Sequence, residues 1–216
     1  MSGEDHAIGK PVLTGSDSAP PLILASGSPV RRQLLEQAGI PVRTDRPGVD
    51  ESEIKAGMGA DGAASAEVAE ALAETKARRI SPRYPGALVL GADQMLDLDG
   101  TWLDKPANRD EAWTHLQRLR GGTHRLSVSA VVVQDGTRLW HQTEMAELTM
   151  RQFSDSFLEA YLDAVGDAAL DSVGAYQLEG LGAQLFARIR GDYFTILGLP
   201  LLPLLGFLRA HKVIRT

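Results

Sequence analysis

The segment Ala87–Pro106, ALVLGADQMLDLDGTWLDKP, constrains the fold of this chain more than any other stretch. It opens with a short apolar run, which is typical of a buried strand. Gly91 and Ala92 are small, so another chain segment or a ligand can approach the backbone there. Asp93 stands where we expect this strand to end, and in open α/β sheets ligands bind beyond the strand ends.

The second half of the segment predicts a β-hairpin, because Asp99-Gly100 is a strong turn signal between apolar runs. Asp93 and Lys105 then lie on its two arms, one acid and one base. Each also has an ordinary interpretation: Asp93 as a turn former or helix cap, and Lys105 as a solvated surface lysine.

A strand-to-helix junction is predicted near the N-terminus. The apolar strand Pro20–Ala25 leads into SGSPVRR, where Ser28 is a good N-cap and Pro29 suits the first helical position. The free N–H groups of this helix end, the hydroxyls of Ser26 and Ser28 and the guanidinium of Arg31 favour an anion, phosphate above all. The alternative is an ordinary Ser-capped helix with solvated arginines.

Two further segments add charged candidates. Glu51, together with Asp50, offers the oxygen ligands that a divalent cation prefers, although a helix-initiating turn has the same composition. The amphipathic pattern of Ala66–Ile80 predicts a helix. Lys76 lies near its C-terminus, where the helix dipole favours a cation in any case.

Glycines and polar side chains alternate in Gly174–Phe186. The glycines indicate tight turns or close backbone approach. Gln177 and Glu179 carry amide and carboxylate groups that suit the hydrogen-bonding edge of a nucleobase. The alternative is a glycine-rich turn with exposed polar tips.

The other predicted elements alternate between helices and strands, as in α/β proteins. They are a strand at Pro41–Thr44, a flexible stretch at Met58–Ser65, a helix capped by Asn108 or Asp110 that runs through Leu119 and ends at Gly121-Gly122, strands at Thr123–Gln134 and Leu139–Met150 joined by Asp135-Gly136, a helix at Ser156–Val165 capped by Ser154 or Asp155, a strand at Phe186–Ile189 and an apolar helix at Leu204–His211. His115, His124 and His141 fall on different elements without metal-ligand spacing, so we interpret them as structural or surface residues.

Composition narrows the function classes. At 216 residues, with 44% hydrophobic and 23% charged residues, the chain suits one large domain or two small lobes around a sizeable core. Its 28 acidic and 22 basic residues give a net charge of −6, which argues against nucleic-acid binding through a basic surface. The absence of cysteine excludes disulfides, thiolate metal sites and a cysteine nucleophile, and fits a cytoplasmic chain.

The ends of the chain carry no membrane or secretion signal. The longest apolar run, Phe194–Leu208, is too short and too interrupted by glycine and proline to span a bilayer. Residues 1–19 are polar, lack the pattern of a signal peptide, and are expected to form a flexible tail. Residues 20–216 are expected to form a single domain.

With these segments in view, the chain resembles the Maf family of nucleoside triphosphate pyrophosphatases. The motifs that carry the resemblance occur in the family's order and cover nearly everything after Pro20. They are LASGSPVRRQLLEQAGI (Leu24–Ile40), VDE (Val49–Glu51), ETKA with Lys76, GADQ (Gly91–Gln94), DKP (Asp104–Pro106), GAYQLEG (Gly174–Gly180), GLGAQLF (Gly180–Phe186) and GLPL (Gly198–Leu201).

The resemblance implies an α/β fold: a curved mixed β-sheet flanked by helices, in two lobes with a nucleotide cleft between them. It implies cleavage of a nucleoside triphosphate to the monophosphate and pyrophosphate with a divalent metal, Mg²⁺ or Mn²⁺. Family members are proposed to clear modified or non-standard nucleotides, and their overproduction has been linked to septum arrest. No nucleic-acid or membrane partner is expected, and a homodimer is left open.

Two competing functions follow from the same residues. A non-catalytic nucleotide-binding regulator of cell division would keep the cations and lose the acid, so the presence of Asp93 and Glu51 counts against it. A pyrophosphatase of the inosine triphosphate type would share the reaction but not these motifs.

The resemblance also implies roles for the candidate residues. Asp93 and Lys105 are the expected catalytic residues, with Asp93 accepting the proton of an attacking water, and Glu51 and Asp93 are the expected metal ligands. The expected substrate contacts are Ser26, Ser28, Arg31 and Lys76 for the triphosphate, and Gln94, Gln177 and Glu179 for the base. Val30 stands where the family usually has the first arginine of SPRR, so Arg32 is a candidate to replace that cation.

The base preference lies between two branches of the family. Gln94 and Glu179 are similar to the branch that prefers 7-methyl-GTP, whereas Gly91-Ala92 and Gly174–Tyr176 are similar to the branch that prefers dTTP and UTP. A Glu carboxylate accepts hydrogen bonds, and guanine offers donors at N1–H and N2–H₂, which favours a guanine-type base over thymine.

Overall fold

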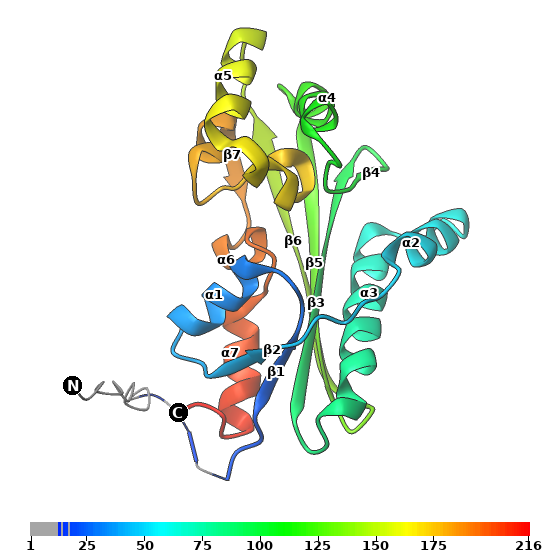
Figure 1. Cartoon of the computed structure of the whole chain (residues 1–216), viewed down its shortest axis with the longest axis vertical. Coiled ribbons are helices and arrows are strands. Elements are labelled where there is room, and N and C mark those ends of the chain that lie inside the picture. The colour runs from blue at the N-terminus through cyan, green and yellow to red at the C-terminus, as the bar shows by residue number, and fades with distance from the viewer. Residues whose placement is uncertain (1–12, 14, 17) are drawn as a thin grey trace, which may run out of the picture.

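A mixed β-sheet runs the length of the molecule in this computed structural model, which describes residues 13, 15–16 and 18–216 (Figure 1). Within these residues the sheet has seven strands in the order β2-β1-β3-β5-β6-β7, with β4 paired to β3 off this path. β1 is parallel to β2 and β3, and the other pairs are antiparallel. The strands are β1 Leu22–Ala25, β2 Val42–Thr44, β3 Leu88–Leu98, β4 Thr101–Leu103, β5 Thr123–Gln134, β6 Thr137–Met150 and β7 Phe186–Arg190.

Helices cover both faces of the sheet (Figure 1). They are α1 Pro29–Gln37, α2 Glu51–Ala60, α3 Ser65–Ile80, α4 Arg109–Leu119, α5 Asp155–Val165, α6 Tyr193–Ile196 and α7 Leu201–Ala210, with short 3-10 turns between residues 166 and 185. In the lower half of the view, α3 packs on one face against β3 and β5, while α1 and α7 lie on the other. The α/β fold expected from the sequence is therefore confirmed.

Helix starts are set by polar N-caps, as their positions in the sequence predict. The side chains of these caps accept hydrogen bonds from backbone N–H groups of the first turn, and each such bond stabilises a helix by about 1 kcal/mol. The caps are Ser28 for α1, Asp50 for α2, Asn108 for α4 and Ser154 for α5. The acidic segment at Asp50 is thus a helix start.

Both predicted hairpins are present, because Asp-Gly pairs adopt the backbone that a two-residue turn requires. Asp99 and Gly100 have φ angles of 50° and 82° between β3 and β4, and Asp135 and Gly136 have 48° and 78° between β5 and β6. Positive φ at both central residues matches the twist of the flanking strands.

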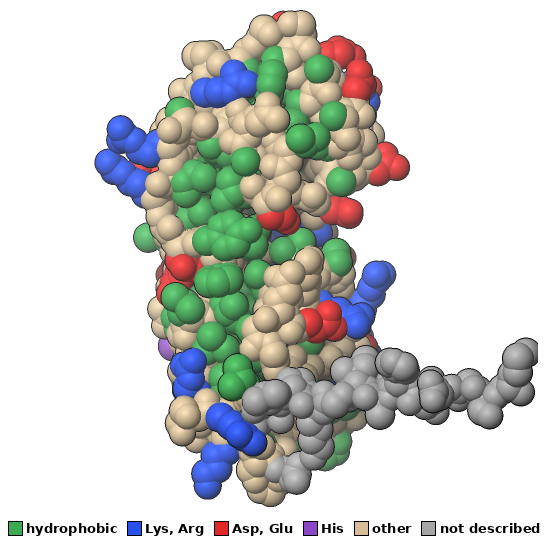
Figure 2. Space-filling model, turned by 90° about the vertical axis from the view of Figure 1, so that its left-hand side faces the viewer, with side chains coloured by type: hydrophobic (Ala, Val, Ile, Leu, Met, Phe, Trp, Pro, Cys, Tyr) green, Lys and Arg blue, Asp and Glu red, His purple; other side chains and the backbone are tan. Residues whose placement is uncertain are grey.

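The two larger hydrophobic cores among the described residues lie along the sheet, one in each lobe. The first packs α1 and α7 on β1 and on the lower parts of β3 and β5, through residues such as Leu24, Leu90 and Leu204. The second packs α4 and α5 on the other ends of β3, β5 and β6, through residues such as Leu116 and Leu148. On the face that Figure 2 shows, hydrophobic side chains run in a band along the long axis. The long strands β3, β5 and β6 therefore run through both lobes and connect them.

Several boundaries differ from the sequence prediction. β3 does not end before Asp93 but continues to Leu98, because β5 pairs with it from Val89 to Asp97. α2 extends to Ala60, inside the stretch expected to be flexible. α7 begins at Leu201, earlier than Leu204. For β3, pairing with a distant strand extends the element beyond its local signal.

The tail prediction for residues 1–19 concerns mostly positions outside the described residues. Of those described, Gly15 and Ser16 donate backbone hydrogen bonds to the carbonyls of Val213 and Lys212 at 3.0 and 3.1 Å. None of the helices in the described part of the chain is long and apolar enough to cross a membrane.

Candidate active site

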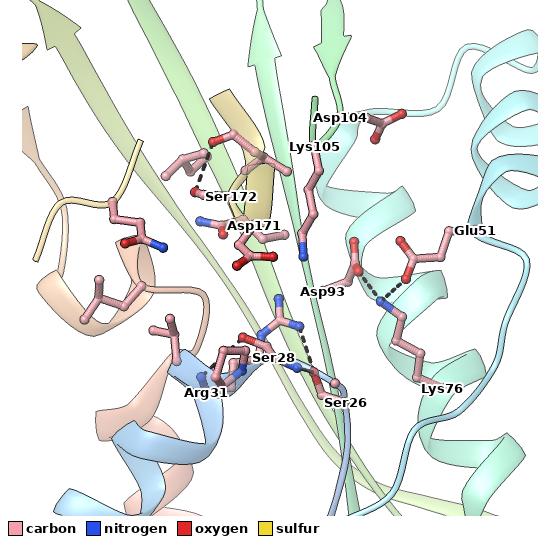
Figure 3. A pocket seen from close by; sticks show the side chains of 18 of the residues that line it. Ser26, Ser28, Arg31, Glu51, Lys76, Asp93, Asp104, Lys105, Asp171 and Ser172 are labelled. Atoms are coloured by element: carbon pink, nitrogen blue, oxygen red, sulfur yellow. Dashed lines mark hydrogen bonds and ion pairs between the residues drawn. The ribbon is translucent and has the colours of Figure 1, made fainter. Parts of the chain in front are cut away.

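A cleft of about 730 Å³ opens between the lobes. Segments that are far apart in the sequence form it: the β1–α1 loop, the β2–α2 connection and the start of α2, the middle of β3, the segment after β4, and residues 171–179. Apart from the candidate Arg32, every site residue expected from the sequence lines this cleft, namely Ser26, Ser28, Arg31, Glu51, Lys76, Asp93, Gln94, Lys105, Gln177 and Glu179. Figure 3 shows how several of them point into it.

The β1–α1 loop forms one side of the cleft. The Ser28 hydroxyl accepts a hydrogen bond from the backbone N–H of Arg31 at 3.4 Å. The Ser26 hydroxyl accepts one from the backbone N–H of Ser28 at 3.2 Å. These contacts order the loop at the N-terminus of α1, where the helix dipole and free N–H groups attract an anion.

Arg31 is buried, and the protein itself uses most of its donors. Nε donates to the Gly198 carbonyl at 2.8 Å, while Nη1 donates to the Ala92 carbonyl at 2.9 Å and to the Ser26 hydroxyl at 3.3 Å. Burial lowers the pKa of Arg31, although Asp93 and Glu51 oppose this shift. Arg31 therefore ties α1 to β3 and to the segment before α7, and it presents Nη2 as its remaining donor.

An alternating charge array lies at the centre of the cleft. Lys76, from α3, donates to Asp93 Oδ1 on β3 and lies 2.6 Å from Glu51 Oε1 on α2 (Figure 3). Asp93 is only 4% exposed, and its Oδ2 is buried without a hydrogen-bond partner among the described residues. Burial alone would raise the pKa of Glu51, but Lys76 and Lys55 outweigh it and the net pKa is lowered.

The unpartnered Oδ2 bears on whether this site fits a divalent metal. A buried carboxylate oxygen without a partner costs about 1–3 kcal/mol unless something binds to it. Asp93 and Glu51 face one another through the Lys76 ammonium, so both carboxylates can turn to the same cation. No group of three or more His, Cys, Asp or Glu suited to a metal occurs among the described residues. The two carboxylates fit a metal that takes its other ligands from phosphate and water, as Mg²⁺ does.

Lys105 points into the cleft from the segment after β4 (Figure 3). Burial, and then the positive charge of Arg31, lower its pKa. No acid lies within ion-pair distance of Lys105 in the described part of the chain, so its ammonium is available to a ligand.

Four charged residues of the cleft were missed by the sequence analysis: Arg46, Lys55, Asp104 and Asp171. Lys55 lies one helical turn after Glu51 and donates to Asp104 Oδ1 at 2.6 Å. Its position four residues after an acid was a readable signal, because i and i+4 share a helix face. No local signal marks Arg46 or Asp171, since only the fold brings them to the cleft.

The residues expected to contact a base line the other wall, and two amides are already engaged there. Gln94 donates to the Ile196 carbonyl at 3.0 Å, and Gln177 donates to the Ala168 carbonyl at 3.4 Å. Glu179 is exposed at the cleft wall. Within the described residues neither side-chain amide oxygen accepts a hydrogen bond, so each is available to a ligand, while the two donated bonds hold the wall in place.

A buried histidine anchors the segment that carries these residues. His124 on β5 is 1% exposed, and its Nε2 lies 2.7 Å from the Tyr176 hydroxyl, next to Gln177. This places His124 in a structural role, as the sequence predicts.

We expect a pH dependence of stability from His124. Burial lowers its pKa to about 4 from 6.5. As the pH falls below 6.5, His124 therefore binds a proton in the unfolded chain, whereas in the folded chain it stays neutral until the pH nears 4. The contribution of His124 is full above pH 6.5 and is lost as the pH falls to about 4, by roughly 3 kcal/mol. Urea unfolding at pH 7 and pH 4.5 measures this loss. His124→Gln keeps a polar partner for Tyr176 but does not titrate, so its pH slope should be shallower; equal slopes would contradict the assignment.

The chain is similar to known proteins over most of its length. Residues 21–211 match the family model described as "Maf-like protein". The chain is 59% identical to the nucleoside triphosphate pyrophosphatase of Paramagnetospirillum magneticum, over 88% of this chain and 97% of that protein. It is 53% identical to the protein of that name from Rhodospirillum rubrum (90% and 96% covered) and 50% identical to the one from Caulobacter vibrioides (90% and 97%). With this match over most of its length, the chain belongs to the Maf-like protein family.

Proposed function

We propose that this protein hydrolyses nucleoside triphosphates to the monophosphate and pyrophosphate with the help of Mg²⁺ or Mn²⁺. The observation that carries the proposal is the buried Asp93 carboxylate, held by Lys76 and with one oxygen unpartnered among the described residues, in a cleft between the lobes. The similar proteins named nucleoside triphosphate pyrophosphatase support the same reaction.

The charge balance of the cleft supports a role for a metal. Five basic side chains line it and so do five acidic ones: Arg31, Arg46, Lys55, Lys76 and Lys105 against Glu51, Asp93, Asp104, Asp171 and Glu179. The side chains alone therefore leave the charge of a triphosphate uncompensated. A divalent ion held by Glu51 and Asp93 would supply the missing positive charge and polarise the phosphoryl group.

The chain's own residues provide the remaining chemistry. A water oxygen bonds to phosphorus, the bridging bond between the α- and β-phosphates breaks, and pyrophosphate leaves. Asp93 accepts the proton of the water. Lys76, Lys105 and the end of α1 hold the triphosphate, so catalysis rests mostly on positioning and electrostatics.

The base preference rests on the wall formed by residues 171–179. The Glu179 carboxylate only accepts hydrogen bonds when ionised, and the Gln177 carbonyl oxygen is also an acceptor. Guanine presents donors on one edge, so we propose that 7-methyl-GTP or a related modified guanine nucleotide is preferred over dTTP and UTP. Clearance of modified nucleotides is the corresponding cellular role.

Pyrophosphate release from a panel of nucleotides tests the function. The panel contains 7-methyl-GTP, dTTP, UTP, ITP and the standard NTPs, each with Mg²⁺, with Mn²⁺ and with excess chelator. Turnover should require metal and be fastest for 7-methyl-GTP. Faster turnover of dTTP or UTP would reverse the base assignment. Binding without any turnover would favour the non-catalytic regulator, and preference for ITP would favour the inosine triphosphate type.

A further inference from the structure

One arginine of the cleft is held by no other side chain among the described residues. Arg46 follows β2 by two residues, lines the cleft and is exposed. It has no ion-pair or hydrogen-bond partner within the described residues, unlike Lys55 and Lys76, which are held by acids. Its neighbour Asp45 accepts hydrogen bonds from Arg83 and Tyr84. The nearest acid in the sequence therefore does not hold Arg46.

The sheet register brings Arg46 to the side of the cleft formed by the β1–α1 loop. β1 and β2 are parallel, with Leu24 opposite Thr44, and the Asp45 N–H continues the ladder by donating to the Leu24 carbonyl at 3.0 Å. Arg46 therefore leaves the sheet level with Ser26, because parallel strands end at the same edge.

Arg46 lies against the loop before α1. A Cβ added at Gly27 would come within 3.2 Å of Arg46 Nε and 3.5 Å of its Cδ. Glycine at position 27 thus leaves the space that the Arg46 side chain occupies beside this loop.

Apart from Arg31, the first turn of α1 offers no cation to the cleft. Val30 follows Pro29, and Arg32 turns to Glu36, with 2.6 Å between Nε and Oε1 and 56% of its side chain exposed. Arg32 is absent from the cleft lining, so the structure contradicts the expectation that it replaces the missing arginine.

We propose that Arg46 supplies this cation and binds the pyrophosphate end of the nucleoside triphosphate, an inference that rests on the proposed function of the cleft. In the proposed function the base is read at residues 171–179 on one wall, whereas Arg46 comes from the β2–α2 connection on another. A guanidinium presents a planar fork of donors that matches phosphate oxygens in pairs. Arg46 is a binding residue and takes no part in proton transfer.

Binding of inorganic tripolyphosphate tests Arg46 without requiring turnover. In isothermal titration calorimetry with Mg²⁺ present, Arg46→Gln should weaken tripolyphosphate binding about 10- to 100-fold, the loss typical of a charge-assisted contact. Arg46→Lys should recover part of the affinity. The matched control is Arg32→Gln, which removes an exposed arginine outside the cleft and should bind as the unsubstituted chain does.

Further measurements distinguish contacts to the pyrophosphate part of the nucleotide from contacts to its base. Binding of the nucleoside monophosphate product should be unchanged in Arg46→Gln. KM for the nucleoside triphosphate should rise, with kcat little altered. Gly27→Ala should weaken tripolyphosphate binding in the unsubstituted chain and have a smaller effect when Arg46 is already Gln, because the two positions are in contact.

The outcomes that overturn the proposal are specific. Unchanged tripolyphosphate affinity in Arg46→Gln, an equal loss in Arg32→Gln, or weakened monophosphate binding would each do so, as would a failure of the unsubstituted chain to bind tripolyphosphate. If tripolyphosphate binding depends on Arg46 but no nucleotide is hydrolysed, the proposed reaction fails and the role of Arg46 stands.

Discussion

Asp93→Asn is expected to reduce kcat by about 10²- to 10⁴-fold while nucleotide binding is kept. Asparagine has the same shape but cannot accept the proton of the attacking water. Lys76 keeps Glu51 as a partner at 2.6 Å, so the cations of the cleft stay in place. Single-turnover hydrolysis and calorimetric titration of a non-hydrolysable triphosphate analogue measure the two quantities separately.

The matched control for this variant is Asp99→Asn. Asp99 lies in the β3–β4 turn with φ of 50°, a conformation that asparagine adopts readily, and it is not part of the cleft lining. It should retain full activity. Turnover near the normal rate in Asp93→Asn would exclude Asp93 as the base and leave it a role in positioning Lys76.

Gly91→Ala is expected to destabilise the fold by about 3 kcal/mol or more, because a side chain here overlaps main-chain atoms. A Cβ at Gly91 would lie 2.0 Å from the Ala73 carbonyl oxygen and 2.9 Å from the Ala77 nitrogen. α3 would have to move away from β3. Since α3 carries Lys76, the contact between Lys76 and Asp93 would be disturbed and activity would fall with stability.

Chemical unfolding of Gly91→Ala and Gly57→Ala gives the comparison. Gly57 lies in α2 with nothing within 4 Å of an added Cβ, so alanine there should stabilise the chain by roughly 0.5–1 kcal/mol through helix propensity. A loss below about 1 kcal/mol in Gly91→Ala would mean that α3 shifts at little cost, and that its close approach does not hold Lys76 in place.

The region around Gly91 shows which features were predictable from the local sequence and which depend on the tertiary structure. The small residues Gly91 and Ala92 indicate a close approach of another segment or a ligand, and the approaching group is the backbone of α3. The apolar run before Gly91 correctly predicts β3, but the predicted end of the strand at Asp93 is wrong. The strand continues through Asp93 because β5 supplies hydrogen-bond partners that no local window contains.

The candidate site divides in the same way. Ser28 and Asp50 are helix caps by their sequence context alone, and the two Asp-Gly turns depend on their own backbone preferences. These features are local, since the atoms that satisfy one another lie within a few residues. The motifs around Glu51 and Asp93 likewise identify the two acids by residue type and by their order along the chain.

What those acids and cations contact was decided by the tertiary structure. Lys76 has the sequence position of an ordinary cation near a helix C-terminus, yet it is buried between Asp93 and Glu51. Arg32 has the sequence position of a phosphate ligand and turns away to Glu36, while Arg46 is carried to the cleft by the register of β1 and β2. The amino-acid sequence determined the elements and the reactive groups, because these depend on nearest neighbours. Their pairing depends on distances between segments far apart in the chain, which exist only once the sheet has formed.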